Sequence, residues 1–336
     1  MLILIKNNIP NNFIKEVKNF LNEKKLNCTI VNSADYTIIA IDGIVSDEII
    51  DQLHCYPFID RIINLKKEYK LVLQEGIISK GINLKGTSIK SGKLTIIAGP
   101  CSVESREQII EIAQFLRDNE VDVLRGGAFK PRTSPYSFQG LGIKGLEYLA
   151  EAGSITGIPV ISEVLSPEDI DIVSQYVDIL QIGARNMYNY PLLKKAGKQN
   201  KPILLKRGLM AKINEFLLSA EYILCEGNNK IILCERGIRT FEVETRNTLD
   251  ISAIPILKRL TSLPIFADPS HASGHSNLVG PLAKACIAAG ADGLIIEVHK
   301  NPRHAKTDGF QSIDFKSFKK LLSELKTLYS VIKEFN

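Results

Sequence analysis

From residue 94 onward the sequence repeats one pattern eight times: a short run rich in Val, Ile and Leu, then a longer segment with apolar residues at helical spacing. Uninterrupted apolar runs of this length are typical of parallel strands that are buried on both faces. The runs span residues 94–100, 123–129, 159–165, 179–184, 202–208, 231–237, 264–269 and 293–299. Eight strand–helix units predict a closed (β/α)8 barrel over residues 94–336; an open doubly wound sheet needs no eighth strand.

The first 68 residues follow a different rhythm, in which strand-like and helix-like segments alternate as βαββαβ. The predicted strands are residues 2–6, 27–32, 36–41 and 59–64, and the predicted helices are residues 12–23 and 47–55. This order predicts a small ferredoxin-like domain over residues 1–68. Residues 69–93 contain four glycines, and we expect them to form a linker and a short hairpin at the N-terminal end of the barrel.

Four side chains that can bind a metal lie at or just after the C-terminal ends of predicted strands. Cys101 follows the first barrel strand, His271 follows the seventh, Glu297 lies near the end of the eighth, and Asp308 lies in the loop beyond it. Closure brings the first and last strands together, so all four gather at the end where barrels carry active sites. A lone cysteine is usually a small buried apolar residue. Together, the four predict a divalent metal site, and the mixed ligands suit manganese, iron, cobalt or zinc.

Positive charges are expected at the same end of the barrel. Five cations lie near C-terminal strand ends: Arg125, Lys130, Arg185, Lys206 and Arg236. One such residue alone would be interpreted as a solvated charge or half of an ion pair. Five cations around one rim repel each other unless a bound anion compensates their charge. The planar guanidinium of arginine can donate paired hydrogen bonds to carboxylate or phosphate oxygens. The loop at 130–135 adds Arg132 and Thr133 between two prolines, so we predict one phosphorylated ligand and infer a second.

Composition excludes several other classes of protein. The chain has 336 residues, of which 45% are hydrophobic and 24% charged, as expected for a globular protein with one barrel and a small domain. No apolar stretch approaches the roughly 18 residues needed to span a membrane, and no signal peptide is evident, so a cytoplasmic location is expected. Six scattered cysteines fit reduced thiols. The net charge of +5, the lack of Trp and the absence of a basic run argue against nucleic-acid binding.

Several segments together resemble 3-deoxy-D-arabino-heptulosonate 7-phosphate (DAHP) synthase. They are AGPCSVES at 98–105, LRGGAFKPRT at 124–133, QIGAR at 181–185, LKRG at 205–208, CERG at 234–237, ADPSH at 267–271, EVH at 297–299 and TDG at 307–309. The resemblance covers the barrel from about residue 94 to residue 314 in the right order.

The resemblance implies condensation of phosphoenolpyruvate with erythrose 4-phosphate and water, with release of phosphate, as the first step of the shikimate pathway. It implies that Cys101, His271, Glu297 and Asp308 hold a metal that polarises the aldehyde, and that Lys130 donates a proton. The implied phosphate ligands for phosphoenolpyruvate are Arg185, Lys206, Arg236 and the backbone N–H of Ala184, and its carboxylate ligands are Arg125 and Lys130. Arg132 and Thr133 would bind the erythrose phosphate. Glu163 and Asp268 either orient water or support the site, or are ordinary rim carboxylates.

Two alternatives stay open for the barrel. A 3-deoxy-D-manno-octulosonate 8-phosphate synthase would share the barrel and the cations, but its loop after the second strand is expected to carry a Lys-Ala-Asn-Arg-Ser type of sequence instead of Lys-Pro-Arg-Thr at 130–133. A noncatalytic sugar-phosphate sensor would be expected to lack a metal ligand or a phosphate-binding cation.

The N-terminal segment resembles a regulatory extension of one subgroup of DAHP synthases. The resemblance implies feedback inhibition by an aromatic amino acid through contacts between subunits, and a homotetramer or a dimer. A fused helical chorismate mutase is disfavoured by the predicted strands. The sequence does not indicate which amino acid would bind.

Overall fold

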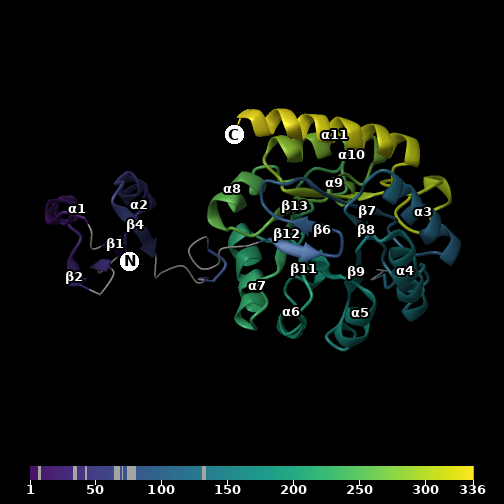
Figure 1. The fold of residues 1–336 in the computed structure, drawn as a ribbon, viewed down its shortest axis with the longest axis horizontal. Helices are drawn as coiled ribbons and strands as arrows, with labels where there is room; N and C mark the ends of the chain where they lie inside the picture. Colours follow the sequence, from purple (N-terminus) through teal and green to yellow (C-terminus); the bar gives the residue numbers. More distant parts are fainter. Residues whose placement is uncertain are drawn as a thin grey trace. The chain divides into compact units, whose positions relative to one another are not determined.

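The computed structural model describes residues 1–6, 9–32, 36–41, 44–63, 69, 71–73, 81–130 and 134–335. The chain divides into two compact units, Met1–Lys70 and Leu71–Asn336 (Figure 1). None of the described helices combines the length and the apolar character needed to cross a membrane.

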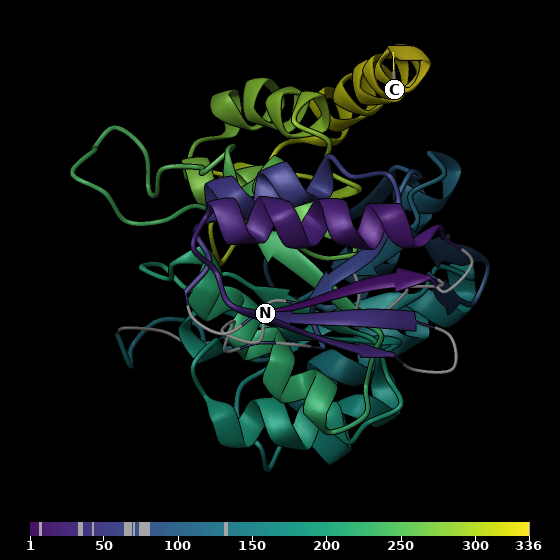
Figure 2. The ribbon, with the colours of Figure 1, turned by 90° about the vertical axis from the view of Figure 1, so that its left-hand side faces the viewer.

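The first unit is an antiparallel sheet with two helices on one face (Figure 2). Its elements are β1 (Leu2–Lys6), α1 (Asn11–Glu23), β2 (Cys28–Asn32), β3 (Tyr36–Ile41), α2 (Asp47–His54) and β4 (Ile59–Ile63). The strand order is β2-β3-β1-β4, so the predicted βαββαβ fold is confirmed. Alternate residues of the central strands, such as Ile3, Ile5 and Ile39, are fully buried in a core shared with Val17 and Leu21 of α1.

The second unit contains a hairpin at the N-terminal end of the barrel. The hairpin consists of β5 (Ile82–Leu84) and β6 (Thr87–Ile89). Ile82 and Ile89 are buried among inward-facing side chains of the barrel strands. Thr87 Oγ1 donates a hydrogen bond to Asp122, which directly precedes the second barrel strand (3.0 Å). The hairpin thus covers one end of the barrel with apolar side chains.

Eight parallel strands close into a barrel in the order β10-β11-β12-β13-β14-β7-β8-β9, which confirms the predicted fold. They are β7 (Thr95–Gly99), β8 (Val123–Arg125), β9 (Val160–Val164), β10 (Ile179–Ile182), β11 (Ile203–Lys206), β12 (Ile231–Glu235), β13 (Ile265–Ala267) and β14 (Gly293–Glu297). Each lies inside one predicted run. The largest difference is at β8, which ends at Arg125 rather than residue 129. Ala128, in the later part of this apolar run, is also fully buried, although it is not in a strand.

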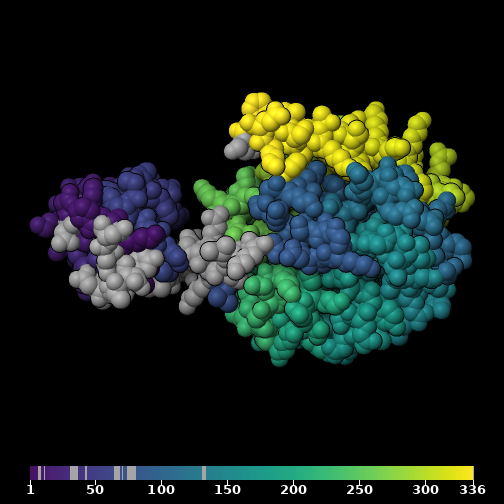
Figure 3. All heavy atoms as spheres, viewed as in Figure 1, coloured from purple at the N-terminus to yellow at the C-terminus, as the bar shows by residue number. Residues whose placement is uncertain are grey.

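Helices cover the outside of the barrel, as the spacing of apolar residues predicts. They are α3 (Arg106–Asp118), α4 (Ile143–Thr156), α5 (Ile170–Tyr176), α6 (Tyr190–Gly197), α7 (Ile213–Cys225), α8 (Ala253–Leu260), α9 (Pro269–Ser273), α10 (Ser276–Ala288) and α11 (Phe315–Phe335), with short 3-10 turns η1 (Ala184–Asn186) and η2 (Pro302–His304). Ser105 caps α3 by accepting a hydrogen bond from the Gln108 backbone N–H (3.1 Å). The long α11 lies along the surface of the barrel unit (Figure 3).

Candidate active site and metal centre

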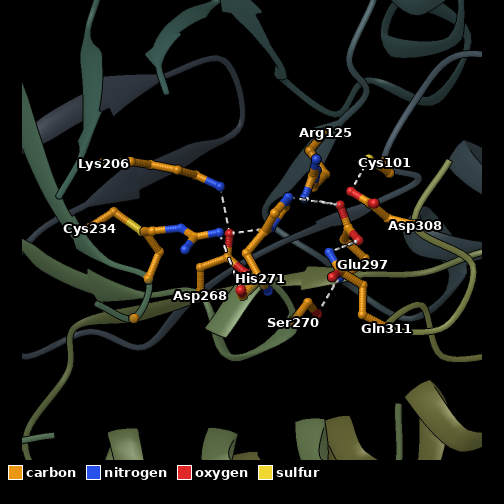
Figure 4. Close-up of polar contacts among 12 residues, drawn as sticks. Cys101, Arg125, Lys206, Cys234, Asp268, Ser270, His271, Glu297, Asp308 and Gln311 are labelled. Atoms are coloured by element: carbon orange, nitrogen blue, oxygen red, sulfur yellow. Dashed lines mark hydrogen bonds and ion pairs between the residues drawn. The ribbon is translucent and has the colours of Figure 1, made fainter. Parts of the chain in front are cut away.

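The four predicted metal ligands converge at the C-terminal end of the barrel (Figure 4). Their ligand atoms all lie within 4.8 Å of one another. Cys101 Sγ is 3.2 Å from Asp308 Oδ2, and His271 Nε2 is 3.3 Å from Glu297 Oε1. Cys101 and Glu297 are buried, and His271 and Asp308 are partly exposed toward the barrel mouth.

Strand order explains this convergence. β14 lies between β13 and β7, and Glu297 at the end of β14 pairs with Gly99 at the end of β7. Gly99 has φ +145°, and a Cβ there would lie 2.2 Å from the Arg125 carbonyl oxygen. Only glycine permits this close approach of β7 to β8. After Gly99 the chain leaves β7 and places Cys101 at the C-terminal end of the barrel.

Asp268 fixes the orientation of His271. Its carboxylate Oδ2 lies 2.7 Å from His271 Nδ1, and its Oδ1 accepts a hydrogen bond from the His271 backbone N–H (2.9 Å). Lys206 Nζ donates to the same Oδ2 at 2.5 Å. Burial alone would raise the pKa of Asp268, but His271 and Lys206 hold that pKa well below its usual range. With Nδ1 engaged, Nε2 faces the cluster, as in many carboxylate–histidine–metal arrangements.

The donor set fits a divalent cation. Burial lowers the pKa of His271, which favours the neutral imidazole that binds metals. Burial and the neighbouring Glu297 raise the pKa of the Cys101 thiol to about 12. The buried Glu297 Oε1 atom lies in the cluster, 3.0 Å from Arg125 Nη1 and 3.3 Å from His271 Nε2. A divalent cation among these side chains would balance the two carboxylates and stabilise the Cys101 thiolate.

A polar cavity of about 170 Å³ opens beside this cluster. Its lining includes His271 and Asp308 and the predicted anion ligands Arg125, Lys130, Ala184, Arg185, Lys206 and Arg236. The structure therefore brings together all the site residues predicted from the sequence that it describes. Arg132 and Thr133, the predicted ligands of the second phosphate, lie outside the described residues.

Three of the cations that line the cavity are almost completely buried. Arg125, Lys206 and Arg236 are 4%, 3% and 5% exposed. Arg125 lies 3.0 Å from Glu297, and Lys206 is paired with Asp268. Arg236 donates one hydrogen bond to the His271 carbonyl oxygen (3.2 Å), whereas its buried Nη1 has no hydrogen-bond partner among the described residues. A buried donor without a partner is costly, so Arg236 indicates a site for an anion.

Lys130 connects the two parts of the site. Its Nζ donates to the Cys101 carbonyl oxygen (3.1 Å) and is buried at the edge of the cavity. Burial acts to lower the pKa of Lys130, but the neighbouring Cys101 and Glu163 raise it above its usual value. Lys130 is therefore a protonated ammonium group that can serve as an acid.

The cavity also contains residues that the sequence analysis missed. Arg239, Arg246 and Asn247 lie on the loop after β12 and line the cavity. This loop has neither strand nor helix periodicity, and no motif in it pointed to these residues. Glu163 also lines the cavity, with Gln181 Nε2 3.4 Å from its carboxylate, and its role stays a prediction.

Residues 77–334 match the DAHP synthetase I family. The chain belongs to this family. It is 51% identical over 329 residues to phospho-2-dehydro-3-deoxyheptonate aldolase of Thermotoga maritima, covering 98% of this chain and 97% of that protein. The crystal structure of the T. maritima enzyme, also called DAHP synthase, superposes with a TM-score of 0.79, 50% identity, and coverage of 99% and 98% of the two chains. A 2-dehydro-3-deoxyphosphooctonate aldolase of Syntrophobacter fumaroxidans is 30% identical over 267 residues, covering 74% and 92%.

Proposed function

We propose that this protein is a 3-deoxy-7-phosphoheptulonate synthase. It condenses phosphoenolpyruvate with D-erythrose 4-phosphate and water, and releases DAHP and inorganic phosphate, the first step of the shikimate pathway. Membership of the DAHP synthetase I family and the similarity along the whole chain support this activity. The observation that carries it is a cationic cavity lined by His271 and Asp308, two of the four side chains of the candidate metal cluster.

The cations that line the cavity suit phosphoenolpyruvate. Arg236 offers a buried Nη1 that lacks a partner among the described residues, and Lys206 and Arg185 line the same cavity. We assign these three side chains and the backbone N–H of Ala184 to the phosphate. Arg125 and Lys130, nearer to the metal ligands, bind the carboxylate. Charge-assisted hydrogen bonds of this kind hold the enol carbon in one orientation.

The four ligand residues would hold one divalent ion, which would supply Lewis-acid polarisation of the aldehyde. Asp268 keeps His271 turned toward that position. As the methylene carbon of phosphoenolpyruvate attacks the aldehyde carbon, Lys130 donates a proton to the aldehyde oxygen. Water then adds to the neighbouring carbon, which carries the phosphate group, and gives up a proton. The bond between that carbon and the bridging oxygen breaks, so that a ketone forms and inorganic phosphate leaves with the bridging oxygen and a proton. Manganese, iron, cobalt and zinc are all compatible with thiolate, imidazole and carboxylate ligands.

A direct test is phosphate release from phosphoenolpyruvate with each of two aldoses. We expect turnover with erythrose 4-phosphate and little with arabinose 5-phosphate, the substrate expected of an octulosonate synthase. The reverse preference would assign the chain to that alternative. No turnover with either aldose in metal-loaded protein would favour the noncatalytic sensor.

We further propose that the N-terminal unit regulates the barrel by binding an aromatic amino acid. The face of its sheet opposite the helices carries half-buried apolar side chains: Leu2, Leu4, Ile38, Ala40 and Ile63. An apolar sheet face suits an aromatic ring or a second subunit. Tyrosine or phenylalanine should inhibit the full-length protein and lose this effect when residues 1–70 are removed. Inhibition that persists in the shortened protein would refute this regulatory role.

Assembly and location are further proposals. We expect a homotetramer, with a dimer as the alternative, and light scattering of the full-length protein distinguishes the two masses. The expected cytoplasmic location rests on the sequence alone.

A further inference from the structure

Gln311 is a buried amide next to the metal ligands that no motif in the sequence singled out. It is 2% exposed and lies in the loop after β14, three residues beyond Asp308. Its Nε2 donates a hydrogen bond to Glu297 Oε2 at 2.6 Å (Figure 4). Its Oε1 accepts a hydrogen bond from Arg246 Nη1 at 2.9 Å. Both ends of the amide are therefore engaged, one by an acid and the other by a cation.

These partners fix the orientation of the amide. A carboxylate only accepts hydrogen bonds and a guanidinium only donates them, so the NH₂ group must face Glu297 and the carbonyl must face Arg246. Arg246 also lies 3.5 Å from Asp308 Oδ1. Gln311 and Arg246 thus connect two of the four ligand residues, Glu297 and Asp308, through side chains that are not ligands themselves.

The hydrogen bond from Gln311 also divides the roles of the two Glu297 oxygens. Oε2 accepts the hydrogen bond from the amide, whereas Oε1 faces the cluster, 3.3 Å from His271 Nε2 and 3.0 Å from Arg125 Nη1. Without the bond from Gln311, the carboxylate would be held only through the contacts of Oε1 and could rotate about its own axis. The bond therefore fixes the plane in which Oε1 is presented to the other ligands.

We propose that Gln311 is a positioning residue for the metal centre. Its amide holds Oε2 of Glu297, so that Oε1 is presented to the ion, and Arg246 holds the amide in the required orientation. This inference rests on the metal-binding part of the proposed function. Partners that orient the ligands of a metal site typically change metal affinity by about 10–100-fold when they are removed.

The test compares Gln311→Met with wild type in the full-length protein. Methionine is close in size to glutamine but cannot donate this hydrogen bond or accept a comparable one. We expect Co²⁺ affinity, measured by competition with a chelator, to fall about 10–100-fold, and the visible spectrum of the Co²⁺-loaded protein to shift. Gln199→Met is the matched control, because the Gln199 amide bonds to Asp171 on the exposed outer surface. It should leave both readouts unchanged.

The outcomes separate this inference from the proposed function. Wild-type affinity and an unchanged spectrum in Gln311→Met would overturn the positioning role, whatever the activity of the protein. Wild-type protein that binds Co²⁺ but turns over neither aldose would refute the proposed function and leave the positioning role intact. If Gln311→Met does not fold, Gln311→Asn, which is one methylene shorter, replaces it, and unchanged Co²⁺ binding by that variant would equally overturn the inference.

Discussion

The two halves of the site differ in how their charges are balanced. On the half formed by β7, β13 and β14, acidic side chains converge, and each has a cation beside it: Glu297 with Arg125, Asp268 with Lys206, and Asp308 with Arg246. On the half formed by β8 to β12 and the loops that follow them, cationic side chains outnumber acidic ones. The buried Nη1 of Arg236 has no hydrogen-bond partner among the described residues. The acidic half fits a cation and the basic half fits anions. Each half partly neutralises the other, so the two kinds of ligand are expected to depend on each other.

The largest expected effect comes from removing a proposed metal ligand on the acidic half. Cys101→Ala should lower kcat at least about 1000-fold, because the Lewis-acid contribution to transition-state stabilisation is several kcal/mol. Rigorous chelation of wild type should have the same effect, and added metal should restore only wild type. Phosphate release from both substrates provides the measurement. Full activity of chelated protein would remove the metal from the mechanism.

On the basic half, Arg236→Met should weaken the binding of phosphoenolpyruvate but stabilise the unliganded protein. Loss of charge-assisted hydrogen bonds to phosphate should raise KM for phosphoenolpyruvate by about 30–100-fold. The same change removes a buried donor without a partner, so the unliganded protein should become more stable by about 1 kcal/mol. Steady-state kinetics and chemical denaturation measure the two effects. Arg117→Met, on the exposed end of α3, is the control that should change neither. A less stable Arg236→Met protein would contradict this account of the buried guanidinium.

Coupling between the halves is the next prediction. Glu297 Oε1 lies 3.0 Å from Arg125 Nη1, so a metal bound by Glu297 would compete with the residue proposed to bind the substrate carboxylate. Metal binding should release Arg125 and strengthen phosphoenolpyruvate binding by about tenfold, a typical coupling between two sites. Calorimetric titration of metal-free and metal-loaded protein measures this difference, and Arg125→Met should abolish it. Equal affinities in the two wild-type forms would show that the halves are independent.

The smallest expected effect is on the pH dependence of metal binding. Burial raises the pKa of Cys101 to about 12, so the thiol carries its proton at neutral pH. The pKa values of Glu297 and Asp308 are lowered despite burial, by His271 and nearby arginines, so both are already ionised. Metal binding must then release one proton from Cys101, and affinity should rise about tenfold per pH unit between pH 7 and 9. Calorimetry in buffers of different ionisation enthalpy counts the protons. No proton release would mean that Cys101 is not a ligand.

Sequence patterns predicted the barrel and the convergence of the four candidate metal ligands for a simple physical reason. Strands buried on both faces must be apolar along their whole length, so each strand leaves a visible run in the sequence. Closure then puts Cys101 and Glu297 on neighbouring strands, as the pairing of β14 with β7 shows. Strand ends were less predictable, because apolar residues outside the strands, such as Ala128, are also fully buried.

The sequence by itself determined which kinds of side chain stand at the C-terminal ends of eight strands, because apolar runs and the residues that follow them are local features. Only the tertiary structure decided how those side chains are paired. Asp268 supports His271 and Lys206, and Gln311 joins Glu297 to Arg246. Lys206 is 62 residues from Asp268, and Arg246 is 65 residues from Gln311. Hydrogen bonds depend on distances and angles in space, and those are set by barrel closure and loop packing rather than by spacing along the chain.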